Sequence, residues 1–108
     1  MAKLERIIKD ENFDSILRRI VSEILESSMS ATLEESSDFC ANGARCSVRV
    51  FERYSYFGNN RVSLSVTLFE NGEEVYLSAV TSGGSQAMFF KINTMGEEAF
   101  LDKLRELV

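Results

Sequence analysis

The sequence contains no histidine, no proline and no tryptophan, and only two cysteines among its 108 residues. Histidine is the commonest general base and zinc ligand, so its absence removes the usual activator of a catalytic serine or cysteine. Cys40 and Cys46 lack the C-x-x-C spacing of a zinc or redox site, and no second cysteine pair could complete a metal tetrahedron. We therefore expect a non-enzymatic protein without catalytic residues, metal or cofactor.

Long apolar runs and an excess of basic residues are also missing. A membrane-spanning helix needs about 20 mostly apolar residues, whereas the longest unbroken run here covers only residues 87–90. The N-terminal residues carry charges throughout, without the apolar region of a signal peptide. A net charge of -5 disfavours general nucleic-acid binding, whose affinity comes mostly from neutralising phosphates. These features predict a cytoplasmic protein that binds neither membranes nor nucleic acid.

Apolar residues at helical spacing predict two helical segments near the N-terminus. Leucine and isoleucine residues predict a short helical turn over residues 3–9, and a longer apolar stripe predicts the main helix over residues 13–28. The phase of the stripe jumps between the two segments. We therefore expect Asn12 or Asp14 to cap the start of the main helix.

Alternating apolar and polar residues predict an antiparallel sheet. Residues 29–33 alternate as a half-buried strand would, and the polar residues 34–38 and the pair Asn42-Gly43 then indicate a loop or turn. Further along, Asn71-Gly72 separates two alternating runs, which is the strongest short signal for a hairpin. With these two residues as the loop, the predicted register places Leu68 opposite Val75.

The strand before this hairpin is expected to turn its valines toward the core. A three-residue loop over 58–60 would place Cys46, Val48 and Val50 on the apolar side and the arginines on the other side. After the hairpin, a turn over 82–85 leads into an expected strand over 87–92. Residues 94–97 fit a capping box, which predicts a C-terminal helix.

The expected fold is therefore α+β. It comprises an antiparallel meander sheet of four or five strands, with an N-terminal and a C-terminal helix packed on one face. Residues 1–108 contain no repeat and no linker, so we expect a single domain.

Two strings, FERYSYFGNNRVSL and TSGGSQAMFFKINTMGEEAF, resemble a small bacterial family of unknown function. The matching residues are Glu52, Arg53, Tyr54, Ser55, Asn60, Arg61, Ser63, Leu64, Ser82, Gly83, Gly84, Ser85, Gln86, Phe90, Lys91, Asn93, Thr94, Gly96 and Glu97. Members of the family have about this length, so the resemblance covers most of the chain. It implies a stand-alone bacterial cytosolic protein and no particular activity, substrate or partner.

The expected uncovered face of the sheet is the first candidate site. It mixes arginines, small hydroxyl side chains and aromatic rings, which is the composition enriched at association surfaces. The residues assigned to it are Arg49, Phe51, Arg53, Ser65, Thr67, Phe69 and Tyr76. This reading predicts a homodimer or a protein partner, and the alternative is a merely solvated sheet face, because serine and threonine are common there.

The glycine-rich turn is the second candidate site. Backbone N–H groups around adjacent glycines can converge on a small anionic ligand, and a nearby arginine or lysine would add charge. The residues assigned to it are Arg53, Arg61, Ser82, Gly83, Gly84, Ser85 and Lys91. The alternative is a tight turn in which glycine supplies a positive φ, since the P-loop pattern is absent. A weaker third reading, from small size and acidity, is a chaperone-like protein.

Overall fold

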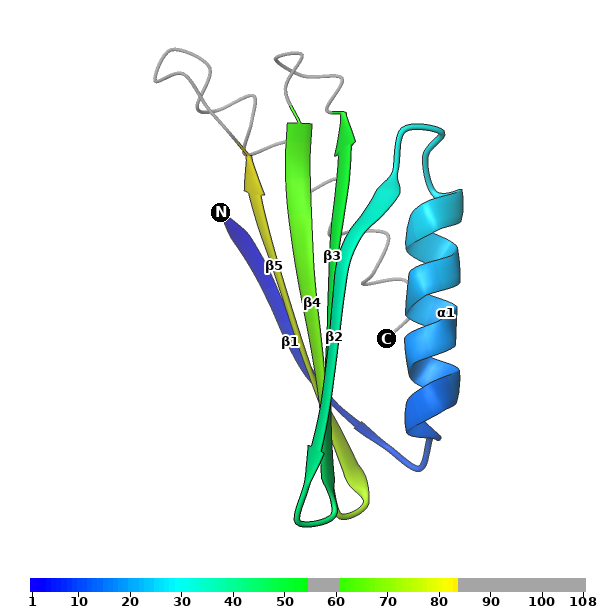
Figure 1. Ribbon diagram of the computed structural model, residues 1–108, viewed down its shortest axis with the longest axis vertical. Coiled ribbons are helices and arrows are strands. Elements are labelled where there is room, and N and C mark those ends of the chain that lie inside the picture. Colours follow the sequence, from blue (N-terminus) through cyan, green and yellow to red (C-terminus); the bar gives the residue numbers. More distant parts are fainter. Residues whose placement is uncertain (55–60, 84–108) are drawn as a thin grey trace.

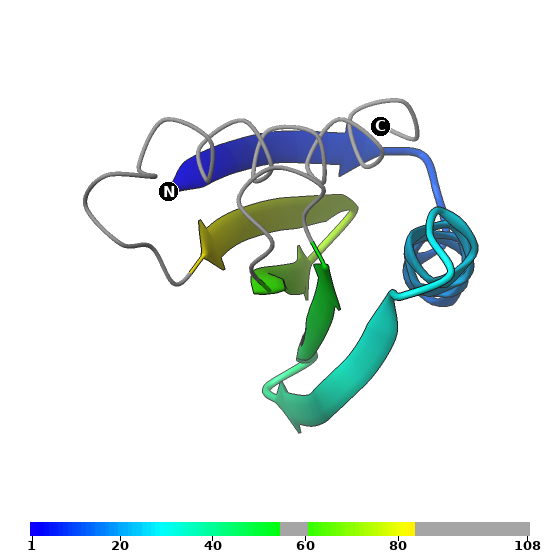
Figure 2. The same ribbon diagram turned by 90° about the horizontal axis from the view of Figure 1, so that it is seen from above.

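The computed structural model describes residues 1–54 and 61–83, which form five strands and one helix. The elements are β1 (Ala2–Lys9), α1 (Phe13–Glu26), β2 (Thr32–Ala41), β3 (Ala44–Tyr54), β4 (Arg61–Asn71) and β5 (Glu74–Gly83). All strands join one antiparallel sheet in the order β1-β5-β4-β3-β2, and α1 lies against one face of it (Figures 1 and 2).

The predicted arrangement of a meander sheet with an N-terminal and a C-terminal helix is wrong. Among the residues described, α1 is the single helix, and the sheet has five strands. The sheet is also not a simple meander, because β1 pairs with β5 and the chain crosses through α1 to the opposite edge at β2. The expected strand over 87–92 and the expected C-terminal helix lie outside the described residues.

The helical turn predicted over residues 3–9 is replaced by the edge strand β1. Ala2, Leu4 and Ile8 are buried at the two-residue period of a strand, whereas Ile7 is 57% exposed. A helix of two turns is marginal in water, while the edge of β5 offers backbone hydrogen-bond partners along the whole segment. Long-range pairing therefore decides the structure of these residues.

The main helix is confirmed, although it ends at Glu26, before the predicted residue 28. The Asn12 side chain accepts a hydrogen bond from the Ser15 backbone N–H at 3.0 Å and so caps the first turn. One stripe of the helix packs on the sheet and is buried: Phe13, Ile16, Ile20 and Ile24.

The first hairpin joins β2 and β3. The loop predicted over 34–38 is instead part of β2, whose residues are all exposed and which pairs with β3. The pairing is irregular between Leu33 and Glu35. The turn at Asn42-Gly43 is confirmed, because their φ values of 53° and 81° are those of a type I′ loop.

The second hairpin, between β4 and β5, is confirmed as an element, but its predicted register is wrong. Asn71 pairs with Glu74, so the loop is Gly72-Glu73, with Gly72 at a φ of 70°. Glycine at the first central position suits a type II′ turn, and moving the two-residue loop by one position shifts the register of the strands by two residues. Leu68 consequently lies opposite Leu77, although the same apolar set still faces the core.

The faces of β3 are also opposite to the prediction. Phe51 lies opposite Leu64 and is fully buried, and Ser47 opposite Leu68 is 3% exposed. Cys46, Val48 and Val50 therefore face away from α1, since side chains alternate along a strand. A one-residue change in loop length reverses every side chain of a strand, so the assumed three-residue loop produced the wrong face.

Candidate functional site

The face of the sheet opposite α1, called the open face below, has a centre without charged side chains. Alternation along β3, β4 and β5 sends every second residue to this side, and most of the intervening residues belong to the buried core on the other side. The uncharged centre comprises Cys46, Val48, Val50, Ser63, Ser65, Thr67, Phe69, Tyr76, Ser78, Val80 and Ser82.

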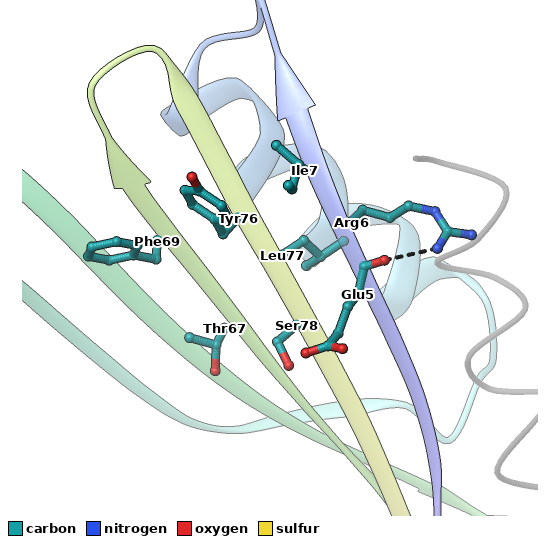
Figure 3. A pocket seen from close by; sticks show the side chains of 8 residues that line it. All are labelled: Glu5, Arg6, Ile7, Thr67, Phe69, Tyr76, Leu77 and Ser78. Atoms are coloured by element: carbon teal, nitrogen blue, oxygen red, sulfur yellow. Dashed lines mark hydrogen bonds between the residues drawn. The ribbon is translucent and has the colours of Figure 1, made fainter.

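Two aromatic rings stand on this centre. Phe69 and Tyr76 are directly paired on neighbouring strands, with ring centroids 6.1 Å apart, and they are 37% and 38% exposed. Figure 3 shows Ile7 beyond Tyr76, on the neighbouring strand β1. These side chains line a shallow, open hollow of about 600 Å³, and the charged residues Glu5 and Arg6 of β1 line its edge. Phe39 of β2, opposite Cys46, adds another exposed ring on this face.

Ion pairs surround the uncharged centre. Along β1, Lys3 lies 3.5 Å from Glu5, and at one end of the sheet Lys9 lies 3.7 Å from Glu74. The charge of Glu74 raises the pKa of Tyr76, and a hydrogen bond of 3.3 Å between them adds to the effect.

At the other end of the sheet, Arg61 lies 2.8 Å from Glu52 and its guanidinium stacks over Tyr54 at 5.6 Å. The charges of the open face therefore lie at its ends and edges, and the described basic groups there are paired with acids.

The sequence-predicted interface residues divide between the two faces. Ser65, Thr67, Phe69 and Tyr76 lie on the open face. Arg49, Phe51 and Arg53 lie on the side of α1, because the register of β3 is opposite to the expected one. Sequence reasoning missed Ile7 and Phe39, which it had placed in a helical turn and beside a loop. Alternation within β1 was the signal that could have identified Ile7.

The residues predicted to bind a small anion do not converge within the described part of the chain. Arg53 and Arg61 lie on opposite faces of the sheet, and Arg61 is paired with Glu52. Ser82 accepts or donates a hydrogen bond with Ser63 at 3.1 Å, and Gly83 continues β5 opposite Val62. Gly84, Ser85 and Lys91 lie outside the described residues.

On the side of α1, two arginines of β3 hold acids from other elements. Arg45 donates two hydrogen bonds to Asp14, at 2.9 and 3.2 Å, and stacks over the Phe13 ring at 4.3 Å. This hydrogen bonding lowers the pKa of Asp14 and raises that of Arg45.

Asp38 of β2 accepts hydrogen bonds from Ser47 at 2.6 Å and from Arg49 at 3.1 Å. The Ser47 bond and then the Arg49 bond lower the pKa of the Asp38 carboxyl. The long-range pair between Asp14 and Arg45 was not visible in the sequence, where Asp14 was one of two candidate caps.

The described residues contain no cluster of three or more histidine, cysteine or acidic side chains arranged to hold a metal. Cys40 lies opposite Arg45 and Cys46 opposite Phe39, so the two thiols point to opposite faces of the sheet. Across residues 1–54 and 61–83, the length and hydropathy of the helical structure fall short of a membrane span.

The described residues thus define a protein with one five-stranded antiparallel sheet, which carries a single helix on one face and an uncharged, partly aromatic centre on the other. The chain belongs to a family of unknown function, DUF6054, which matches residues 1–108. This agrees with the resemblance drawn from the sequence. A search of curated proteins found no match to the chain.

Proposed function

We propose that this protein is a non-enzymatic, self-associating module in which two copies pack their open faces against each other. The observation that carries the proposal is the uncharged centre of the open face, with the exposed rings of Phe69 and Tyr76. A surface depleted of charge and carrying aromatic anchors is typical of the centre of an association interface. A second copy offers the same surface, as a two-fold symmetric dimer requires.

The size of the open face supports a dimer. Strands of 10 or 11 residues span roughly 35 Å at about 3.3 Å per residue, and five strands about 4.8 Å apart cover about 24 Å. The face therefore has an area of about 800 Å², which matches the area that each partner buries in a standard stable interface. Two such faces can stack at about 10 Å, as in β-sandwiches.

The distribution of charge also supports self-association. Two copies of a chain with a net charge of -5 repel each other, and contact through uncharged centres keeps the acidic surfaces apart. The ion pairs Lys3–Glu5 and Lys9–Glu74 lie at the rim, where charges are tolerated, because water still reaches them. We place this module in the bacterial cytoplasm, where the free thiols of Cys40 and Cys46 remain reduced.

The proposal is tested by measuring the mass of the full chain in solution with light scattering after size-exclusion chromatography. We expect a dimer at micromolar concentration. Thr67→Glu places a carboxylate in the centre of the open face, which should convert the dimer into a folded monomer. Ser15→Glu, on the exposed surface of α1, adds the same charge and should leave the dimer intact.

Circular dichroism confirms that each variant is folded. A wild-type chain that stays monomeric at high micromolar concentration contradicts the proposal. So does a folded Thr67→Glu variant that is dimeric, because its buried carboxylates would repel each other without water. Loss of the dimer in Ser15→Glu as well would assign self-association to α1 instead of the open face.

A further inference from the structure

A second hollow lies on the other side of the sheet, between α1 and β3. It is an open trough of about 500 Å³ lined by Asp14, Leu17, Arg18, Val21, Ser22 and Arg49. This volume is in the range of sites for small organic ligands, about 300–1,000 Å³. The trough is independent of the proposed dimer, because the open face lies on the opposite side of the sheet.

Arg49 is the most enclosed charged group of the trough, with a side chain that is only 14% exposed. Within the described part of the chain it donates through Nη1 alone, to Asp38 at 3.1 Å and to the Val48 carbonyl at 3.0 Å. Nε and Nη2 form the second fork of the guanidinium. Two parallel donors of this kind match the two oxygens of a carboxylate.

The charges around Arg49 favour an anion. Asp14 is the only acid among the lining residues, and both of its oxygens are bound by Arg45. Arg18 is exposed at the rim and adds a further positive charge. Among the lining residues, two guanidiniums, those of Arg18 and Arg49, therefore accompany one acid, Asp14, whose carboxylate is already paired with Arg45.

The remaining wall of the trough is apolar. Leu17 and Val21 are one turn apart on α1 and only half-buried, beside the buried stripe of the helix. Leu25 continues this line by one more turn and is also partly buried. A ligand that covers these side chains would remove apolar surface from water at a site that also supplies a carboxylate partner.

We propose that this trough binds a small aliphatic carboxylate. The carboxylate takes the Nε and Nη2 donors of Arg49, and the hydrocarbon chain lies along Leu17 and Val21 on α1. An arginine with a free fork selects the charged head group, while the apolar line selects the tail. A neutral molecule of the same length makes the apolar contact with Leu17 and Val21 but lacks the charge-assisted hydrogen bonds to Arg49.

The test uses octanoate and 1-octanol as probes of the purified full chain, with affinity measured by titration calorimetry. We expect octanoate to bind at least about tenfold more tightly than octanol, since a charge-assisted pair of hydrogen bonds is lost with the alcohol. Arg49→Gln should reduce octanoate affinity by at least about tenfold and leave octanol affinity unchanged. Arg6→Gln removes an exposed arginine from β1 and serves as the matched control, with unchanged binding of both probes.

Further variants keep the test decisive if Arg49→Gln is unstable. Arg18→Gln changes an exposed residue and should weaken octanoate binding several-fold, and Val21→Asp should weaken both probes. Thr67→Glu, on the open face, should bind octanoate as wild type does.

Three results would each overturn the proposal: equal affinity for octanoate and octanol, no binding of octanoate, or wild-type octanoate affinity in a folded Arg49→Gln variant. A loss confined to Thr67→Glu would move the site to the open face.

Discussion

At the scale of single residues, arginine makes the contacts that join distant segments. Arg45 combines two hydrogen bonds to Asp14 with stacking on Phe13, and so ties β3 to the start of α1 across 31 positions of sequence. Arg49 and Asp38 connect β3 with the exposed edge strand β2 in the same way. Lysine has neither the planar group nor the forked donors for such contacts.

The pair between Asp14 and Arg45 predicts a pH dependence of stability. Because the pKa of Asp14 in the folded protein lies below its ordinary value of 3.8, the pair stabilises the fold fully above that pH. The contribution disappears as the pH falls through the lower pKa of the folded state. Urea unfolding between neutral pH and about pH 2 should therefore show a smaller acid loss of the free energy of unfolding in Asp14→Asn than in wild type.

Glu23→Gln is the matched control, because Glu23 is an exposed acid on the same helix that makes no ion pair with a described residue. Its acid loss should equal that of wild type. Parallel curves for wild type and Asp14→Asn would show that the Arg45 contact does not persist in solution.

At the scale of elements, β3 is the strand whose placement matters most for function. Its orientation decides that the arginines lie beneath α1 and that valines and Cys46 complete the open face. The orientation follows from pairing Phe51 with Leu64, which buries a full aromatic ring in the core. A buried phenylalanine contributes more than the half-buried valines of the other face, so the core selects this register.

A pair of phenylalanine truncations tests this orientation. Phe51→Ala should lower the free energy of unfolding by about 3–5 kcal/mol, because it empties a filled site in the core. Phe69→Ala, on the open face, should cost no more than about 1 kcal/mol, because the ring is 37% exposed and its loss leaves no filled core site empty. Urea unfolding at low protein concentration, where chains are monomeric, measures both. Equal losses in the two variants would contradict the assigned faces of β3.

At the scale of the whole molecule, the sheet separates two surfaces with different chemistry. The side of α1 carries the core and the arginine-lined trough, and the open face carries the uncharged centre. One cysteine lies on each side, with Cys40 exposed and Cys46 half-buried on the open face. The two thiols therefore report separately on the two surfaces.

Thiol labelling should detect the proposed dimer without a mass measurement. Raising the wild-type concentration should slow the labelling of Cys46, because the partner covers the open face, while Cys40 reacts at a constant rate. In Thr67→Glu the rate at Cys46 should not depend on concentration. Mass spectrometry of peptides after timed labelling gives both rates from one sample. A Cys46 rate independent of wild-type concentration argues against burial of the open face.

The candidate surface was partly predictable from the sequence. The alternation of β4 and β5 placed Ser65, Thr67, Phe69 and Tyr76 correctly on one face, because a register error of two residues leaves every side chain on its own side. The register error for β3 was an odd number of residues, so the prediction placed Arg49 on the wrong face of the sheet. In the structure Arg49 lies on the side of α1, where it lines the trough. The trough itself was not predictable, since its walls come from α1 and β3, which no local pattern connects.

The sequence alone determined the features that depend on near neighbours. Helix α1, a cap at Asn12 or Asp14 and the Asn42-Gly43 turn follow from side-chain spacing and backbone preferences within a few residues, and the structure assigns the cap to Asn12. Only the tertiary structure decided that the first residues form β1. There the Ala2 backbone donates to the Thr81 hydroxyl at 3.2 Å across 79 positions of sequence. Whether a segment forms a strand, and which face of the sheet its side chains take, depends on such distant partners. This is because burial and hydrogen bonding against these partners outweigh the local conformational preference of a short apolar segment.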